Sequence, residues 1–354
     1  MATVSVIIPT HSRPQLLRRA IASAFAAGTD VEVVVVDDAS ADATAAVCRA
    51  LRNITYVRLD ENQGVAGARK AGVLASSGEY IALLDDDDVR LPGTLDLQLE
   101  RLRETPEAGL IYAQALFSNG TDRGGRDRYP QHCPSGDVFW RLLAQNFIPS
   151  GSVVFRRSCL ATTGMFEPSI AGIDDWDLWV QIAELFPVIA LEQPVITWRR
   201  PSPISDQRSA RAVEMVSLAT HQFRERWMKL PRAIAAPAGL RRNAAREFSQ
   251  NMASHLVWEA GRSLSYGRCR VRADAYSPLS AFIPRDSPGA PGVESHRTAS
   301  ERFKPRNPAP AKDHLQPAET CSPLRRPSFP SRRTRRRDRV VGSYVAVARI
   351  FVPA

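Results

Sequence analysis

The first 84 residues alternate short apolar runs with segments of helical periodicity, and this alternation constrains the fold more than any other feature of the chain. The apolar runs are rich in Val and Ile without regular polar positions, which is typical of strands buried on both faces. The pattern predicts a parallel sheet covered by helices on both sides. The predicted strands span residues 4–8, 31–36, 54–59 and 80–84, and the predicted helices span residues 15–27, 41–51 and 65–76.

A run of four aspartates, residues 85–88, directly follows the fourth predicted strand. Four adjacent carboxylates repel one another, and an apolar core cannot hold them unpaired. The carboxyl ends of parallel strands meet at one edge, so this run should lie beside Thr10, His11, Asp37 and Asp38. Carboxylate oxygens bind hard cations, which usually bring phosphate oxygens with them. The alternative interpretation is a solvated acidic turn.

This edge carries neither of the glycine-rich motifs that commonly bind phosphate. No G-x-G-x-x-G sequence follows the first predicted strand, and no G-x-x-x-x-G-K-[ST] sequence occurs in the chain. In those motifs, backbone amides cradle the phosphate groups. A phosphate bound at this edge would therefore need cations and side chains to neutralise its charge.

Cysteine usage and hydropathy favour an intracellular protein. The five cysteines have no metal-ligand spacing, and an odd number in a chain of 354 residues is typical of reduced thiols. An apolar run starts at Val4 without a basic segment before it, and no run of about 18 or more apolar residues occurs. We expect a cytoplasmic protein and leave open a peripheral association with the inner face of a membrane.

The basic charge of the chain belongs to its C-terminal part. From Arg268 onward the chain holds 18 Lys and Arg against 7 Asp and Glu, together with 12 of the 26 prolines. This shift in composition predicts a boundary near residue 267 and a disordered tail. Residues 332–337 could attract nucleic acid, although no specific nucleic-acid partner is expected. An out-of-frame reading of a GC-rich gene would also produce such a segment.

The middle of the chain predicts one more strand, over residues 110–115, and helices over residues 206–230 and 244–264. We expect these helices to pack their apolar faces against the sheet. Residues 120–128 predict a Gly- and Arg-rich loop, which either folds over a ligand or lies on the surface. The sequon at residues 119–121 is interpreted as a turn.

Five segments in this order resemble glycosyltransferase family 2, over about residues 3–200. They are residues 4–10 (VSVIIPT), 35–42 (VVDDASAD), 62–69 (NQGVAGAR), 78–88 (GEYIALLDDDD) and 151–179, which includes GSVVFRR, GMF and DDWDLW. The resemblance implies a GT-A fold, in which a mostly parallel sheet is flanked by helices. It also implies a nucleotide-sugar donor, a divalent metal bound through a D-x-D motif, and inversion at the anomeric carbon.

The resemblance further implies a donor site at the carboxyl edge of the sheet. Its donor-binding residues are Pro9, Thr10, His11, Asp38, Arg69, Asp85 and Asp86, and its metal ligands for Mg²⁺ or Mn²⁺ are Asp87 and Asp85. A carboxylate at Asp38 can accept the imide N–H of uracil, which favours a UDP-sugar. Because the run is all aspartate, the roles of its four members stay open. Each assignment has an alternative. Asp37 and Asp38 could instead form the turn before the next helix, and Arg69 could instead be a solvated charge on a helix.

The chain departs from the family pattern in three places. His11 and Ser12 replace a common Tyr and Asn, and imidazole can still stack on a base. Lys70 replaces an Asn after the matched Arg. The family often has a His after the segment that corresponds to residues 198–200. Residues 201–205 contain no His, so no metal or phosphate role is assigned there.

Asp175 is the predicted general base. An inverting transfer needs a group that takes the proton of the acceptor hydroxyl, and a carboxylate can do this. Asp175 matches the acid of the family's acidic pair, with Asp174 in place of the more usual Glu. Apolar residues at helical spacing follow, so Asp175 should stand at a helix N-terminus, where the dipole favours the ionised form. A simple N-cap is the alternative.

These features predict four regions. They are a nucleotide-sugar-binding half (1–115), an acceptor-binding and catalytic half (116–230), a helical extension (231–267) and the tail (268–354). The predicted function is transfer of a sugar from a nucleoside-diphosphate sugar to a glycan, lipid-linked or protein acceptor in polysaccharide and cell-envelope biosynthesis. The alternatives are a sugar nucleotidyltransferase and nucleic-acid binding through the tail. The oligomeric state is left open.

Overall fold

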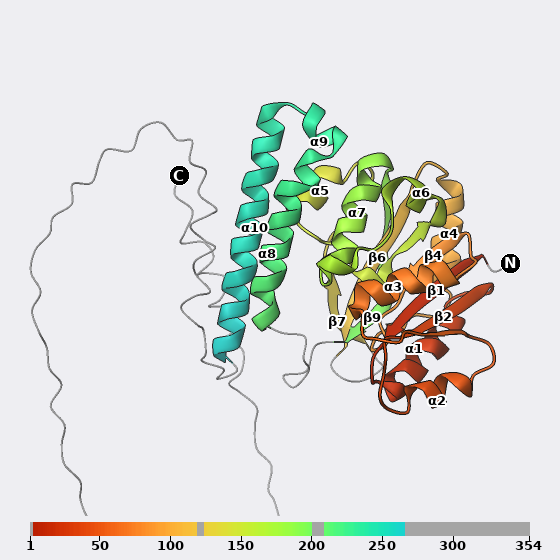
Figure 1. Cartoon of the computed structure of the whole chain (residues 1–354). Coiled ribbons are helices and arrows are strands. Elements are labelled where there is room, and N and C mark those ends of the chain that lie inside the picture. The colour runs from red at the N-terminus through yellow and green to blue at the C-terminus, as the bar shows by residue number, and fades with distance from the viewer. Residues whose placement is uncertain (1–2, 119–123, 200–208, 266–354) are drawn as a thin grey trace, which may run out of the picture. The chain divides into compact units, whose positions relative to one another are not determined.

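The computed structural model describes residues 3–118, 124–199 and 209–265 (Figure 1). These residues belong to the first of two units into which the chain divides, Met1–Pro288. The predicted tail, its basic segment at 332–337, the sequon at 119–121 and residues 201–205 lie outside the described residues.

One mixed sheet forms the centre of the described part. Its strands are β1 (Val4–Thr10), β2 (Val31–Asp37), β3 (Thr55–Arg58), β4 (Tyr80–Leu83), β5 (Val89–Arg90), β6 (Leu110–Ser118), β7 (Gly124–Tyr129), β8 (Val154–Arg156) and β9 (Val188–Arg199). The order is β3-β2-β1-β4-β8-β6-β9-β5, with β7 paired to β6. The strands β3, β2, β1 and β4 are parallel, as predicted. The second half is mixed: β8 is antiparallel to β4 and β6, whereas β9 is parallel to β6.

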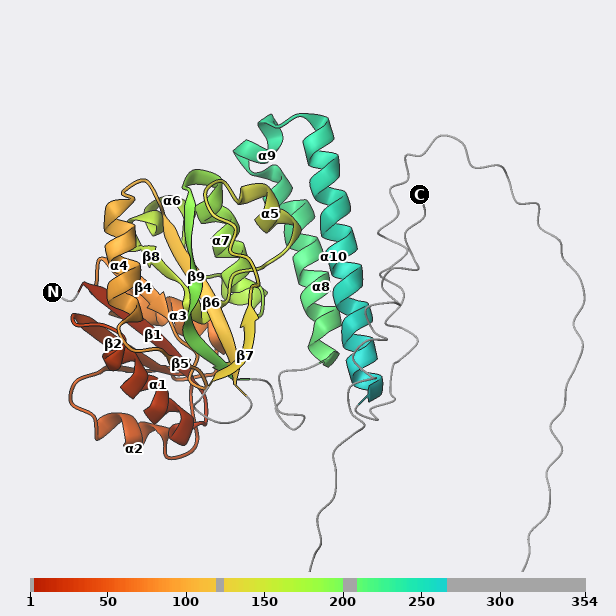
Figure 2. The same ribbon diagram turned by 180° about the vertical axis from the view of Figure 1, so that it is seen from behind.

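Helices lie on both faces of this sheet (Figures 1 and 2). They are α1 (Pro14–Ala26), α2 (Thr44–Arg49), α3 (Gly64–Ala75), α4 (Thr94–Glu104), α5 (Phe139–Ala144), α6 (Leu160–Thr163), α7 (Asp174–Leu185), α8 (Ser209–Glu225), α9 (Pro231–Ala235) and α10 (Ala238–Ser265). Short 3-10 turns are η1 (Ser150–Ser152), η2 (Arg157–Cys159), η3 (Pro168–Ile170) and η4 (Trp227–Lys229).

The apolar character of β1 explains the two helical layers. Ile7 enters the hydrophobic cluster that includes residues of α3 and α7, whereas Val6 and Ile8 enter the cluster formed with α1 and α4. All three side chains are fully buried. A strand with both faces covered needs apolar residues at every position, so the continuous apolar runs are accounted for. The predicted fold class, α/β with helices on both faces, is confirmed.

Three expectations about the elements were wrong. Residues 124–128 belong to strand β7, which pairs with β6, instead of the predicted loop over 120–128. Helix α2 begins at Thr44 rather than residue 41, because the Asp42 carboxylate accepts hydrogen bonds from the N–H and hydroxyl of Thr44. The late helices are placed differently from the prediction: α8 ends at Glu225, and α10 begins at Ala238.

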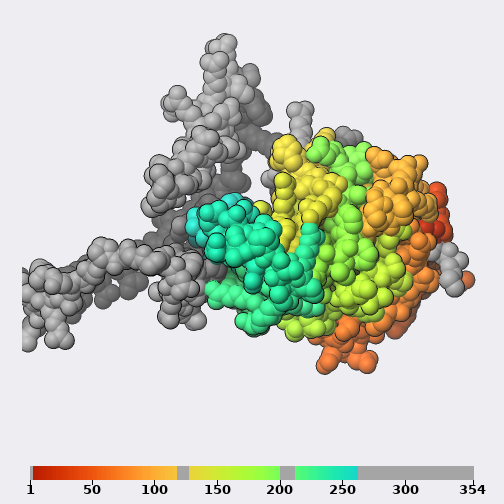
Figure 3. All heavy atoms as spheres, turned by 90° about the horizontal axis from the view of Figure 1, so that it is seen from above, coloured from red at the N-terminus to blue at the C-terminus, as the bar shows by residue number. Residues whose placement is uncertain are grey.

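The C-terminal helices pack mainly on other helices rather than on the sheet. Figure 3 shows their teal atoms beside the yellow and green atoms of the middle of the chain, seen from above. Phe223 of α8 stacks on Phe248 of α10, with ring centroids 4.2 Å apart. Trp227 lies against Trp176 of α7 at 4.9 Å between centroids. The apolar faces of α8 and α10 therefore cover α7 and α5. Among the described helices, none is long and apolar enough to cross a membrane.

Candidate active site at the carboxyl edge of the sheet

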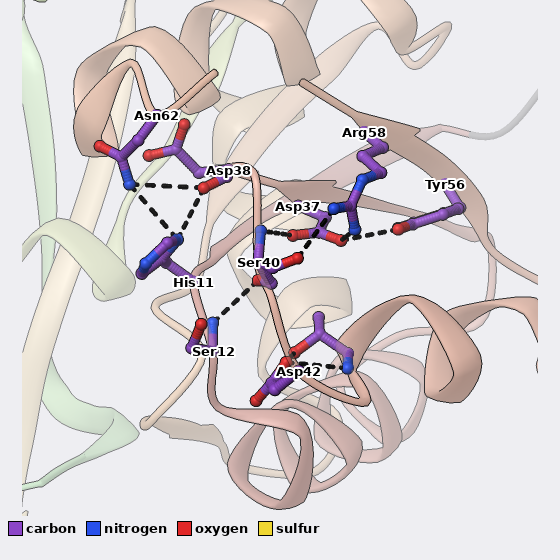
Figure 4. A network of polar contacts seen from close by, with 10 residues as sticks. His11, Ser12, Asp37, Asp38, Ser40, Asp42, Tyr56, Arg58 and Asn62 are labelled. Carbon is purple, nitrogen blue, oxygen red and sulfur yellow. Dashed lines mark hydrogen bonds and ion pairs between the residues drawn. The ribbon is translucent and has the colours of Figure 1, made fainter. Parts of the chain in front are cut away.

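At the end of β2, Asp37 is fully buried, and its carboxylate faces several hydrogen-bond donors (Figure 4). Its carboxylate accepts hydrogen bonds from the Ser40 N–H at 2.8 Å and the Tyr56 hydroxyl at 2.7 Å, and pairs with Arg58 at 2.8 Å. Burial by itself would raise the pKa of Asp37, but the hydrogen bonds from Ser40 and Tyr56 and the Arg58 charge together lower it. Asp37 therefore forms the turn after β2, as one of the two alternatives for this acidic pair predicted.

Asp38 has different partners from Asp37. Its Oδ1 accepts a hydrogen bond from the Gln63 N–H at 2.7 Å, and its side chain is nearly buried. Its backbone carbonyl accepts hydrogen bonds from His11 Nδ1 at 2.6 Å and from Asn62 Nδ2 at 3.3 Å. The structure thus brings His11 and Asp38 together at the ends of β1 and β2, as Figure 4 shows.

The acidic run after β4 is mostly buried, so the interpretation as a solvated turn is wrong. The exposed fraction is 6% for the Asp86 side chain and 18% for Asp87, and Asp88 is also buried. Only Asp85, at 35%, is well exposed. Thr10, held by β1 beside β4, donates its hydroxyl to Asp86 at 2.7 Å. Pro9 lies buried in β1 beside Thr10.

The acids of the run have few donors for their burial. Arg13 Nη1 lies 3.1 Å from Asp86 and 3.3 Å from Asp87, and the Arg199 N–H donates to Asp88 at 2.9 Å. Burial raises the pKa of Asp86 to about 6, despite Thr10 and Arg13. Burial and the Asp85 charge also raise the pKa of Asp87 and of Asp88. The run is therefore short of positive charge.

The carboxylates of the run suit a hard divalent cation in their chemistry. Within the described residues no group of three or more His, Cys, Asp or Glu side chains is arranged to hold a metal. Mg²⁺, however, usually takes one or two carboxylates and completes its shell with water and substrate phosphates. The partly accessible oxygens of Asp87 and Asp85 fit a site of that kind, and the raised pKa of Asp87 shows that added positive charge would be favourable there.

Arg69 connects the acidic run to helix α7. Its guanidinium lies 2.9 Å from Asp85 and 3.0 Å from Asp174, and its side chain is only 5% exposed. The interpretation of Arg69 as a solvated helix charge is therefore wrong. Helix α3 comes this close to β1 because Gly72, one turn after Arg69, has no Cβ; a Cβ there would collide with Ile7. The two acids hold the pKa of Arg69 above its usual value, against the effect of burial.

Asp175 is the second residue of α7 and is partly exposed. The N-cap position belongs to Ile173, so the N-cap interpretation is wrong; the Asp175 carboxylate accepts from the adjacent Trp176 N–H at 2.6 Å. Burial and the neighbouring Asp174 charge raise the pKa of Asp175 to about 7, although Arg69 opposes the shift. The helix dipole was expected to favour the ionised form of Asp175, whereas desolvation and the Asp174 charge act in the opposite direction.

Asp177, two positions further along α7, has a structural task. Its carboxylate accepts the Trp227 Nε1–H at 2.7 Å and pairs with Arg226 at 3.2 Å. This contact was not predicted from the sequence, and neither were the contacts that Arg13 and Asp88 make at the carboxyl edge of the sheet. A basic residue directly after the first strand is the one local signal that could have identified Arg13, because strand ends converge at the acidic edge.

Comparison with known proteins shows which proteins this region is similar to. Residues 5–162 match the family described as "Glycosyl transferase family 2". The succinoglycan biosynthesis protein ExoO of Rhizobium meliloti is 44% identical over 101 residues, which are 28% of this chain and 29% of that protein. The putative colanic acid biosynthesis glycosyl transferase WcaA of Escherichia coli is 27% identical over 187 residues, 51% of this chain and 65% of that protein. The chain thus spans less than two thirds of either relative.

Two solved structures share the fold. TarS 1-349 of S. aureus, in complex with UDP-GlcNAc, superposes with a TM-score of 0.58 at 16% identity, covering 79% of this chain and 81% of that one. The mannosyltransferase PcManGT of Pyrobaculum calidifontis, in complex with GDP-Man and Mn²⁺, gives 0.54 at 20% identity and covers 79% of both chains. The likeness to these two structures shows that the fold is of the GT-A type, and residues 5–162 match the model of glycosyltransferase family 2.

Proposed function

We propose that this chain transfers a sugar from a nucleoside-diphosphate sugar to an acceptor hydroxyl, with inversion at the anomeric carbon. The observation that carries the proposal is the buried Arg69, which pairs with Asp85 at the end of β4 and with Asp174 at the start of α7. Through Arg69, the acidic run of the donor half lies close to the candidate base Asp175. The boundary between a donor half (1–115) and an acceptor half (116–230) falls within β6 and is part of the proposal.

The donor binds at the carboxyl ends of β1, β2 and β4. In the part of the chain that the structure describes, Asp38 uses Oδ1 for the Gln63 N–H, so its second oxygen can accept the imide N–H of uracil. Pro9, Thr10, His11, Arg69, Asp85 and Asp86 complete the proposed donor site. TarS and PcManGT were solved with nucleoside-diphosphate sugars, which supports the donor class, while the preference for UDP rests on Asp38.

Asp87 and Asp85 would hold Mg²⁺ or Mn²⁺ together with the diphosphate. The bound ion supplies positive charge that stabilises the leaving diphosphate. Asp86 contributes indirectly, because its carboxylate holds the Thr10 hydroxyl and the Arg13 guanidinium beside Asp87. The Mn²⁺ in the PcManGT complex supports a divalent ion for this fold.

Asp175 takes the proton of the acceptor hydroxyl as that oxygen attacks the anomeric carbon. A general base is most effective when its pKa lies near the working pH, and the pKa of about 7 at Asp175 meets that condition. The names of ExoO and WcaA support a glycan acceptor in exopolysaccharide biosynthesis. A location on the cytoplasmic side of the membrane stays a prediction.

The test of this function is Asp175→Asn, assayed with a panel of nucleoside-diphosphate sugars. The variant should bind donor and metal normally and lose on the order of a hundredfold or more in transfer rate, because it cannot take the proton. In the wild type, kcat/KM should fall as the pH drops below about 7, where Asp175 becomes protonated. The variant should lack this decline, and NMR of the wild-type product should show the inverted anomer.

Asp177→Asn is the matched control on the same helix. It should lower the unfolding midpoint, because it weakens the contacts to Trp227 and Arg226, while keeping the wild-type pH profile. Near-normal transfer by a folded Asp175→Asn protein would remove Asp175 as the base and move the search to Asp174 or Asp177. A retained anomer would overturn the inverting mechanism itself.

A further inference from the structure

Arg13 lies in the loop between β1 and α1, beside the acidic run, and no role was predicted for it from the sequence. Its backbone is held on both sides. Ser12 adopts a left-handed φ of 55° and donates its N–H to Ser40 Oγ at 2.8 Å, and Figure 4 shows these two residues facing each other. On the other side, the Arg13 carbonyl accepts the Leu17 N–H at 3.0 Å as helix α1 begins at Pro14. A non-glycine residue in this conformation is strained, so the loop is held in place by its contacts.

The guanidinium of Arg13 bridges two acids through one nitrogen. Nη1 lies 3.1 Å from Asp86 Oδ1 and 3.3 Å from Asp87 Oδ2. The Arg13 side chain is nevertheless 36% exposed, in contrast to 5% for Arg69, which serves Asp85. Arg69 is buried, whereas Arg13 lies beside the same run with its side chain partly open to solvent.

We propose that Arg13 acts as an internal cation, which neutralises Asp86 and Asp87 before the donor arrives and passes to the diphosphate when a divalent ion binds at Asp87. This inference rests on the proposed function, since it assumes the metal site at Asp87. In the free protein Arg13, in the loop after β1, partly neutralises the acidic run. When the donor and the ion bind, the divalent ion replaces the guanidinium of Arg13 at Asp87.

The exchange follows from charge and geometry. A guanidinium and a divalent ion on the same carboxylate repel each other strongly at short range in a partly buried site. When the ion binds, the Arg13–Asp87 contact breaks and the guanidinium is free to donate elsewhere. Its planar fork of N–H groups matches phosphate oxygens well, and a diphosphate carried by the ion would lie within the same edge. Arg13 therefore lowers the affinity of the site for the ion alone and raises its affinity for the diphosphate once the ion is bound.

The test measures Mn²⁺ binding to the full chain by electron paramagnetic resonance, without any nucleotide. Arg13→Gln should bind Mn²⁺ about tenfold more tightly than the wild type, because the competing charge is gone. Arg58→Gln is the matched control: Arg58 is 41% exposed and pairs with Asp37 at the end of β2, so it removes the same charge from the same sheet edge. Its Mn²⁺ affinity should stay within about twofold of the wild type.

A second measurement follows UDP binding at saturating Mn²⁺ by calorimetry. Here Arg13→Gln should bind about tenfold more weakly, because a donor to the diphosphate is lost. Arg13→Lys keeps the charge, so its Mn²⁺ affinity should stay near that of the wild type, and it tests the inference even if the Gln variant folds poorly. If Arg13 only stabilised the loop, Arg13→Gln should weaken both Mn²⁺ binding and UDP binding.

The outcomes separate the inference from the function on which it rests. Equal or weaker Mn²⁺ binding by folded Arg13→Gln, with wild-type binding intact, would overturn the role of Arg13 alone. A gain that persists when Asp87→Ala is added would also overturn it, because the extra ion would then sit elsewhere. Absence of Mn²⁺ and Mg²⁺ binding in every variant, with and without UDP, would overturn the proposed metal site and the inference together.

Discussion

The ends of β2 and β4 lie at the same edge of one sheet, and both carry aspartates, but the two groups have opposite surroundings. At the end of β2, Asp37 is fully buried with three donors, and its pKa is lowered. At the end of β4, the buried Asp86 and the partly exposed Asp87 share the guanidinium of Arg13, and the pKa of each is raised. Burial is common to both places, so the supply of donors makes the difference.

This difference separates a structural carboxylate from one that is ready to bind. A buried acid with enough donors is stabilised in its ionised form and gains little from a further cation. A buried acid with too few donors raises the free energy of the empty protein, and a cation that binds there relieves it. Perturbed acids in such positions are typical of functional sites. The two strand ends thus assign different tasks to chemically identical side chains.

The largest effect is expected for Asp87→Ala. Transfer should fall by about a hundredfold or more, because the ion that stabilises the leaving diphosphate loses its ligand. The unfolding midpoint should stay level or rise, since a carboxylate with a raised pKa is removed. The assay is transfer rate together with a thermal melt. Asp60→Ala, an exposed acid after β3 on the same edge, is the control and should leave both unchanged. Full wild-type activity after dialysis against EDTA would contradict the prediction.

The second effect concerns stability. Asp37→Asn should lower the free energy of unfolding at pH 7 by about 2–3 kcal/mol, because charge-assisted hydrogen bonds in a buried site are weakened. The lowered pKa of Asp37 means that its stabilisation is complete above the usual Asp pKa and is lost as the pH falls through the lower folded value. Urea titrations at pH 7 and in strong acid should therefore show a difference that disappears in acid. A difference that grows as the pH falls would show that the sign is wrong.

The smallest effect separates two neighbouring residues of one turn. Asp38→Asn should weaken UDP binding about tenfold, or about 1.4 kcal/mol, because an amide is a poorer acceptor for the imide N–H than a carboxylate. Stability should change by less than about 0.5 kcal/mol, since the Asn oxygen can still accept the Gln63 N–H. Calorimetry with UDP and Mn²⁺ measures the first quantity and urea titration the second. Unchanged UDP affinity would remove Asp38 from the donor site.

The sequence was a good guide to the first half of the fold. The predicted strands and helices up to residue 84 all occur, most within one or two residues of their predicted ends. The apolar runs and the helical periodicity are local signals, and burial on both faces of β1 accounts for them. The second half was predicted less well: β7 was taken for a loop, and β5, β8 and β9 were not placed. Strands β5 and β8 are short, β7 and β8 pair with their neighbours in antiparallel fashion, and β9 pairs with β5 and β6 from distant parts of the chain.

The sequence also placed acids at the right edge, because parallel strands bring their carboxyl ends together. The family resemblance placed Asp38 in the donor site, but the residues by themselves did not show which of Asp37 and Asp38 forms the turn, nor whether Asp175 is an N-cap. Those distinctions depend on which donors reach each carboxylate. Asp37 receives Tyr56 and Arg58 from β3, and Asp175 lies beside Asp174 and Arg69.

Composition and local periodicity were therefore enough to establish an α/β chain with an acidic edge, since both properties are carried by neighbouring residues. Only the tertiary structure decided which acids have enough hydrogen-bond donors, which have too few and which pair with Arg69. Thr10 reaches Asp86 across 76 positions, and Arg69 reaches Asp174 across 105. Contacts over such distances leave no periodic trace in the sequence. The pKa of each acid follows from them, because desolvation and nearby charge depend on positions in space and not on order along the chain.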